Sequence, residues 1–195
     1  MKKCLLLAAF ALSTAIANDL SAQYYKPTRI FKQGQADIRA SAGLLPTYAK
    51  DASRMVVPPV SLGIDWMVSD QFSVGVELGY SHYQMEKLPA GETDMRHYDN
   101  QTLLVMTRAL AHFTRRDNLD IYGGFRFGTQ MVRIRSLDGP FGAAERLIGI
   151  RPQRTRFQYG ACLGFRFAVS PGTHILGEAG TGISLINVGV GFKIK

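Results

Sequence analysis

The sequence predicts an all-β fold, an eight-stranded antiparallel up-and-down transmembrane β-barrel, from three observations. The first is the segment Val68–Tyr83, in which large apolar residues alternate with glycine, serine and one glutamate after a short turn signal. Successive side chains of a strand point to opposite faces, so this period of two indicates a β-strand rather than a helix. The second observation is that the alternation returns, in weaker form, along the rest of the chain. The third is that long polar connections alternate with short turns.

The N-terminus has the layout of a signal peptide. Two lysines precede the apolar run Cys4–Ile16, and small residues stand at Ala17 and Ala22. The run is too short for a spanning helix, which needs about 20 apolar residues. Cleavage after Ala22 begins the mature chain with the polar Gln23, and cleavage after Ala17 is the alternative. We therefore expect a cleaved signal peptide (1–22), an irregular lead-in (23–34) and a β-barrel domain (35–195).

Taken in order, the alternating pattern predicts eight strands, at 36–45, 59–68, 72–83, 101–113, 119–135, 155–169, 173–180 and 185–194. The fourth is the least regular, because Leu103–Met106 is apolar on both faces. The fifth changes the face of its apolar residues near Val132, which predicts a β-bulge there. Five of the others, at 36–45, 59–68, 72–83, 155–169 and 185–194, place their apolar side chains on one face.

The connections between these strands are of two kinds. Three are long and polar, at 46–58, 84–100 and 136–153, and the connections that alternate with them contain only three to five residues. A barrel in an outer membrane has this layout, with long loops outside the cell and short turns in the periplasm. A strand of about ten residues, rising about 3.3 Å each and tilted about 40°, gains roughly the 25 Å of height that such a barrel presents to lipid.

The face opposite the apolar one indicates which side meets lipid. It carries charged residues among many glycines and serines, as a narrow lumen requires, where long charged side chains pair across it beside small ones. The predicted lumen network is Arg39, Asp65, Glu77, Arg108, Asp120, Arg126, Arg156, Arg166, Glu178 and Lys193. Aromatic residues near strand ends would form girdles at the membrane surfaces: Trp66, Tyr80, Tyr83, Phe113 and Phe157. The alternative is a soluble periplasmic, lipocalin-like ligand-binding barrel with its apolar faces inward.

Two segments carry a resemblance to a known family. V-S-D-Q-F-S-V-G-V-E-L-G-Y (68–80) and L-I-N-V-G-V-G-F-K-I-K (185–195) resemble small outer-membrane β-barrel proteins of the OmpX/OmpA-barrel type. The resemblance implies a place in a Gram-negative outer membrane. It departs from the family at the C-terminus, where many such barrels end on an aromatic residue but Phe192 is followed by three more residues.

No catalytic, cofactor-binding or metal-binding residues are predicted. Some barrels of this size are lipid A deacylases with a His-x-Ser element, but none of the four histidines here is followed two residues later by serine. Ser81 and His82 are adjacent, so a strand sends them to opposite faces. His97, with Glu92, Asp94 and Asp99, fits a solvated loop better than a metal site. Cys162 is expected to be a small interior residue.

These observations lead to a function without an enzyme activity. The net charge of +8 comes from scattered basic residues, which excludes a nucleic-acid patch. We expect a structural or surface-interaction barrel whose partners are outer-membrane lipid and a molecule met by the loops at 46–58, 84–100 and 136–153. A lipid-modifying enzyme and a narrow transporter are the alternatives for a membrane barrel.

Overall fold

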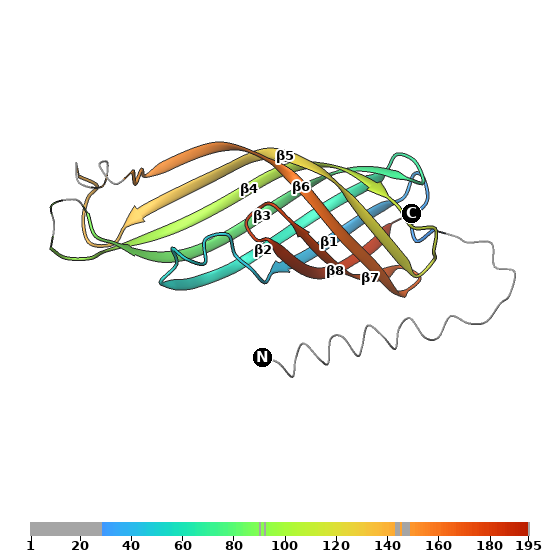
Figure 1. The fold of residues 1–195 in the computed structure, drawn as a ribbon, viewed down its shortest axis with the longest axis horizontal. Coiled ribbons are helices and arrows are strands. Elements are labelled where there is room, and N and C mark those ends of the chain that lie inside the picture. Colours follow the sequence, from blue (N-terminus) through green and yellow to red (C-terminus); the bar gives the residue numbers. More distant parts are fainter. Residues whose placement is uncertain (1–28, 90, 92, 143–144, 146–148, 195) are drawn as a thin grey trace, which may run out of the picture.

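A computed structural model describes residues 29–89, 91, 93–142, 145 and 149–194. The strands are β1 (Ala36–Gly43), β2 (Arg54–Met67), β3 (Phe72–Lys87), β4 (Arg96–His112), β5 (Leu119–Ser136), β6 (Gln153–Ser170), β7 (Thr173–Gly180) and β8 (Ile186–Ile194). They pair antiparallel in chain order, and β1 pairs with β8 to close the barrel (Figure 1). The predicted fold class is confirmed. The predicted signal peptide and residues 23–28 lie outside the described residues.

The apolar faces of the strands point outward. On β3, Phe72, Val74, Val76 and Leu78 are exposed, whereas Glu77 between them is buried. Phe125 is 72% exposed on β5, and the other strands also show exposed outward leucine, valine and isoleucine. So much exposed apolar surface around a closed barrel requires lipid as its solvent, so the soluble lipocalin-like alternative is wrong. Within the described part of the chain, no helix is long and apolar enough to cross a membrane.

The outward apolar residues form a band of limited height. On β3 it runs from Phe72 to Tyr80, roughly 20 Å for a strand that rises about 3.4 Å per residue at a tilt of about 40°. Trp66, Phe113 and Phe157 are exposed near the edges of the band, as the aromatic girdle requires. Tyr83 was assigned to that girdle wrongly. It stands an odd number of positions from Tyr80, so it points inward and is only 7% exposed.

Five strands extend beyond this band. β2 to β6 contain 14 to 18 residues, whereas β1, β7 and β8 contain 8 or 9. Figure 1 shows β3 to β6 running far past the β7–β8 hairpin at the end of the barrel opposite the C-terminus. We call these extensions the projecting sheet: residues 54–59, 82–87, 96–101, 132–136 and 153–156. The end that carries them is the outer mouth, and the opposite end, where the short turns lie, is the inner mouth.

The projecting sheet corrects two of the predicted loops. β2 begins at Arg54 inside the predicted 46–58 loop, and the predicted 84–100 loop shortens to 88–95 because β3 ends at Lys87 and β4 begins at Arg96. These segments are strands whose outer faces meet water, so they carry polar residues without the apolar alternation of a lipid-facing strand. A polar segment without that alternation predicts a loop. The third prediction agrees closely, because β5 ends at Ser136 and β6 begins at Gln153.

Above the band the two faces exchange their polarity. On β5, Arg133 and Arg135 face outward while Val132 and Ile134 face inward, with no register shift between β5 and either neighbour. The predicted bulge near Val132 is therefore wrong, because the register is unchanged there. The apolar residues change face because the solvent outside the strand changes from lipid to water. Register shifts occur instead near Val57 on β2 and between Ala168 and Ser170 on β6.

Candidate functional site

Charged side chains fill the lumen at the level of the apolar band. Eight of the ten predicted lumen residues are buried and ion-paired there: Arg39, Asp65, Glu77, Arg108, Asp120, Arg126, Arg166 and Glu178. The other two lie elsewhere. Arg156 is exposed at the outer mouth. Lys193 is half-buried at the inner mouth, where its Nζ donates to the carbonyl of Ile30 at 3.2 Å.

One cluster surrounds two glutamates. Arg108 donates to Glu77 at 2.6 Å and to Glu178 at 2.7 Å, so it bridges β3 and β7 across the lumen. Arg39 donates to the same oxygen of Glu77 at 2.8 Å, and Arg126 donates to Glu178 at 3.0 Å. These contacts join five strands, because each side chain comes from a different one.

A second cluster surrounds Arg166. Its guanidinium lies 3.1 Å from Asp37, 2.8 Å from Asp65 and 3.3 Å from Asp120. It also stacks over the ring of Tyr122 at 4.4 Å from the centroid, a cation–π contact. The lumen network predicted from the sequence includes neither Asp37 nor Tyr122.

The clusters nearly balance in charge. Four arginines face five carboxylates (Asp37, Asp65, Glu77, Asp120 and Glu178), and two histidines adjoin the set, His112 beside Asp120 and His174 beside Asp37. Burying such groups is costly unless each is paired, and here the pairs extend across the barrel. The described side chains therefore fill the lumen as a plug, as an eight-stranded barrel allows.

Glycines make the room that these long side chains need. A Cβ added to Gly164 would lie 2.5 Å from the Cζ and Oη atoms of Tyr122, whose hydroxyl donates to Glu178 at 3.1 Å. Real Cβ atoms do not approach other atoms so closely, so a larger residue at 164 would displace the ring. Cys162, beside Tyr122 and Leu110, is buried as the sequence predicts.

The lead-in closes the inner mouth. Ile30 and Phe31 are buried against Met67 and Ala168, and the Phe31 ring meets the imidazole of His174 edge-on at 5.5 Å between centroids. Arg29 donates to the carbonyls of His112 and Thr114. Residues 29–34, which form neither a helix nor a strand, are therefore a cap on the barrel.

Beneath this cap lies a Ser–His–Asp hydrogen-bonded chain that sequence analysis missed. Ser73 Oγ is 2.9 Å from His112 Nε2, and His112 Nδ1 is 2.8 Å from Asp120 Oδ2. This order of groups is that of a nucleophile, a base and an orienting acid. Ser73 is buried, however, and the hollow between the cap and His112 is too small for a water molecule. A substrate carbonyl has no access to Ser73 in this conformation. All three side chains stand at inward positions near the short turns, which is the signal that could have indicated them.

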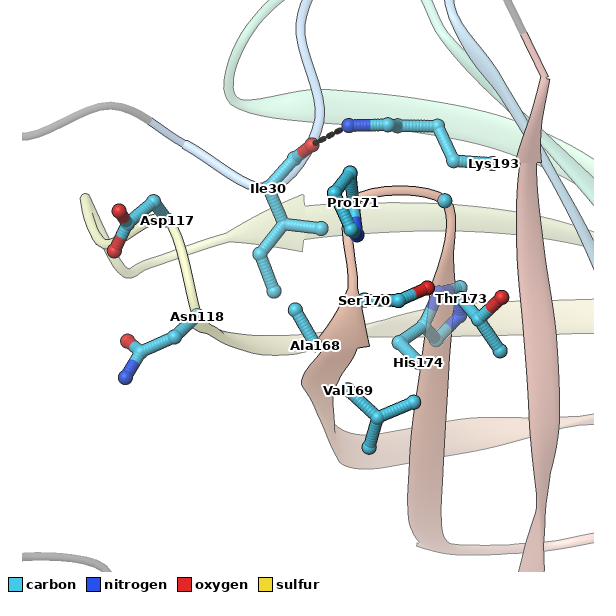
Figure 2. Close-up of a pocket in the computed structure, with 11 residues that line it drawn as sticks. Ile30, Asp117, Asn118, Ala168, Val169, Ser170, Pro171, Thr173, His174 and Lys193 are labelled. Carbon is cyan, nitrogen blue, oxygen red and sulfur yellow. Dashed lines mark hydrogen bonds between the residues drawn. The ribbon is translucent and has the colours of Figure 1, made fainter.

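A larger cavity, of about 360 Å³, opens beside the cap at the inner mouth. Figure 2 shows it between the β6–β7 turn, the β4–β5 turn and the cap, with the Lys193–Ile30 hydrogen bond across one side. Backbone and small side chains of the turns line most of it. Its polar groups do not converge on one point, so it offers little for recognising a ligand.

A different cavity, of about 350 Å³, lies within the projecting sheet at the outer mouth. Tyr48, from the β1–β2 loop, stacks on Tyr83 at 4.0 Å between ring centroids and 6° between planes. Burial raises the pKa of the Tyr48 phenol. Further apolar side chains continue the lining, and three arginines stand among them: Met85, Val132, Ile134, Ile150, Ile183, Arg151, Arg154 and Arg156. Asn100, Thr102 and Gln130 also line the cavity, so it combines an apolar part with polar groups, in contrast to the lumen, which ion pairs fill.

Two carboxylates fix the β5–β6 loop to β4. Glu145 accepts from the Gly142 N–H at 2.8 Å and from Arg96 at 2.5 Å, and these donors hold the pKa of its carboxyl below its usual range. The His97 N–H donates to Asp138, and this bond together with the His97 ring lowers the pKa of Asp138.

The residues considered as a metal site are not assembled into one. His97 lies near Asp138 and Glu86, whereas Asp99 pairs with His82 at 2.5 Å. Glu92 lies outside the described residues. Among the residues that the structure describes, no group of three or more His, Cys, Asp or Glu side chains is placed to hold a metal ion.

An apolar outer band, a lumen of ion pairs and a water-facing sheet above the band define the class of protein. The chain has the architecture of a small outer-membrane β-barrel of the OmpX/OmpA type.

No family model matches the chain, and no curated protein matches it in sequence. Its structure is similar to that of Ail from Yersinia pestis (12% identity, TM-score 0.49, covering 83% of this chain and 99% of that chain). It is also similar to OprG from Pseudomonas aeruginosa (14%, 0.47, 86% and 98%) and to Neisserial surface protein A (14%, 0.44, 83% and 96%). At these identities the similarity concerns the fold.

Proposed function

We propose that the protein is an outer-membrane barrel with a structural or surface-interaction role, which holds the projecting sheet and its loops outside the cell. The observation that carries this proposal is the extension of β2 to β6 into water beyond the apolar band. The displayed connections correspond to the three predicted loops, with the bounds that the strand ends give them: residues 44–53, 88–95 and 137–152. At the other end the connections are short turns, which leave little surface for a partner.

The lumen supports an interaction role over transport. Arg126 and Arg166 are at most 2% exposed and cross the interior between ion-paired carboxylates, so an ion would have to displace buried pairs to pass. The enclosed Ser73 likewise gives a lipid-acting hydrolase no substrate access. The arginines and aromatic residues at the outer mouth are side chains that partner surfaces often use.

The proposal includes removal of residues 1–22 on export, leaving a mature chain that begins with residues 23–34 and continues as the barrel. Mass measurement of the purified outer-membrane protein tests the cleavage, because Ala22 and Ala17 give different mature masses.

Orientation is tested with single cysteines on a Cys162→Ser background. Thr93 lies exposed in the β3–β4 loop and Ser170 lies exposed at the β6–β7 turn. Thr93→Cys should react with a membrane-impermeant maleimide on intact cells, whereas Ser170→Cys should react only after lysis. The reverse labelling pattern would overturn the proposed display of the projecting sheet.

The interaction role is tested by replacing residues 88–95 with a two-residue Asn-Gly turn, a favoured hairpin connection. We expect cells with this variant to lose attachment to surfaces or to one another, while the unboiled gel band still migrates apart from the boiled one. The matched control replaces the β4–β5 turn at the inner mouth. Attachment that survives removal of all three outer loops would refute a surface-interaction role.

A further inference from the structure

We propose that the cavity at the outer mouth binds a small amphiphilic carboxylate, with its apolar body on the tyrosine-lined floor and its carboxylate on Arg154 and Arg156. The inference concerns an interior site, so it does not depend on the surface interaction proposed above. The cavity volume of about 350 Å³ lies within the range of about 300–1,000 Å³ found for small-molecule sites.

The floor of the cavity suits an apolar body. Tyr48 and Tyr83, stacked face to face, line the cavity, and Met85, Ile150 and Ile183 join the same cluster of buried residues. Aromatic and flexible apolar side chains of this kind are common in ligand pockets, because they bury ligand surface without specific geometry.

The arginines supply a positive charge that the cavity does not neutralise. Lys87, which also lines the cavity, pairs with Asp51 at 2.8 Å. Arg151, Arg154 and Arg156 make no ion pair with any residue that the structure describes. Three guanidinium groups beside an apolar floor complement an anion with an apolar body, and a guanidinium binds a carboxylate through two parallel hydrogen bonds.

The place of the cavity agrees with an amphiphilic ligand. Arg156 and Arg154 alternate with Phe157 and Thr155 along β6, so they point inward just above the band that meets lipid. β7 pairs with β6 only from Cys162 onward, so residues 153–159 have a strand neighbour on the β5 side alone. The short β7–β8 hairpin therefore leaves the cavity wall low on this side, beside the membrane surface, where amphiphiles concentrate.

The test is a methyl NMR titration of the full mature barrel at neutral pH in nanodiscs of phosphatidylcholine, a zwitterionic lipid without net charge. Decanoate is the probe, decanol is its uncharged counterpart and acetate is its counterpart without the apolar body. We expect decanoate to produce saturable shifts of the Met85 and Ile183 methyl groups. Decanol and acetate should produce no saturable shift.

Two double variants with equal loss of charge separate the cavity from the surface. Arg154→Gln/Arg156→Gln removes the inward pair, and we expect it to weaken decanoate binding at least about tenfold, the change that 1.4 kcal/mol produces. Arg133→Gln/Arg135→Gln removes the outward pair on the neighbouring strand, and we expect less than a twofold change.

Three results would overturn the proposal: no saturable shift with decanoate, equal binding of decanol, or equal weakening by both double variants. Both variants are first checked for the mobility difference between unboiled and boiled samples. If the inward double variant does not fold, Arg156→Gln alone is titrated, and binding within twofold of the unmodified protein would also overturn it.

Discussion

Arg166 offers the sharpest test of the lumen as an ion-paired plug. Its side chain is fully buried and faces three aspartates at 2.8 to 3.3 Å. Replacing it with Met keeps an apolar chain of comparable length but leaves those carboxylates without their shared cation. Removing one partner of a buried ion pair costs about 3–5 kcal/mol. The lost cation–π contact with Tyr122 adds about 1 kcal/mol. We therefore expect Arg166→Met to destabilise the barrel by about 4–6 kcal/mol.

A second substitution should recover part of this loss. Asp65 keeps Arg39 and Arg108, and Asp120 keeps His112, but among the residues that the structure describes Asp37 keeps only His174, at 3.2 Å. The double variant Arg166→Met/Asp37→Asn removes the carboxylate that is left with the fewest partners. We expect it to be more stable than the single variant, with a coupling energy of about 0.5–3 kcal/mol between the two substitutions, the usual range for residues in contact.

The assay is equilibrium unfolding in urea after refolding into phosphatidylcholine vesicles. Trp66, the one tryptophan of the chain, is 56% exposed on the lipid-facing side and reports insertion by its fluorescence. Arg133→Met, on the water-facing side of β5, is the control and should change stability by less than about 0.5 kcal/mol. A cost below about 1 kcal/mol for Arg166→Met, or strictly additive effects of Arg166→Met and Asp37→Asn, would refute the argument.

Three further predictions concern other parts of the barrel. Gly164→Ala should cost about 1–3 kcal/mol in the same assay, since its Cβ overlaps the Tyr122 ring. Gly172→Ala should cost little, because no atom lies within 4 Å of its new Cβ. Equal effects of the two substitutions would contradict the close fit of the lumen. A fluorophosphonate should label no serine of the folded barrel, and labelling that Ser73→Ala abolishes would show that a substrate does reach the hydrogen-bonded chain. The carboxyl of Glu145, followed by its ¹³C shift, should titrate below the ordinary glutamate value of about 4.3. Because this folded-state pKa is lowered, the stabilisation is present at neutral pH and is lost as the pH falls through it; titration at or above the ordinary value would contradict it.

Sequence patterning succeeds where one face meets lipid. The bounds predicted for β7 agree with the structure, and the other strands are predicted at their band-level positions, because lipid requires an unbroken apolar face. Sequence patterning fails at the ends of β2, β3 and β4. There water meets the outer face, and the polar residues on that face led to the prediction of loops. The inverted polarity at Val132 was taken for a bulge for the same reason.

For the lumen, too, the sequence predicts one property and not another: it predicts which residues point inward, but not which of them are in contact. Alternation assigns Arg39, Glu77 and Arg166 to the inward face without any knowledge of the fold, since parity along a strand decides the face. It cannot say which inward residues meet. Ser73, His112 and Asp120 come from three strands, and their contact depends on the register set by two turns and by the tilt of the barrel.

The sequence by itself determined that this chain alternates along its strands and carries charge on one face, which predicts a β-barrel and favours a membrane barrel over a soluble one. Those properties are local, because each follows from neighbouring residues and from the solvent each face requires. The tertiary structure alone decided that Arg166 gathers three aspartates, that Ile30 and Phe31 cap the inner mouth, and that Tyr48 stacks on Tyr83 in a cavity that three arginines also line. These contacts join residues far apart in the chain, and barrel closure and strand register bring them together.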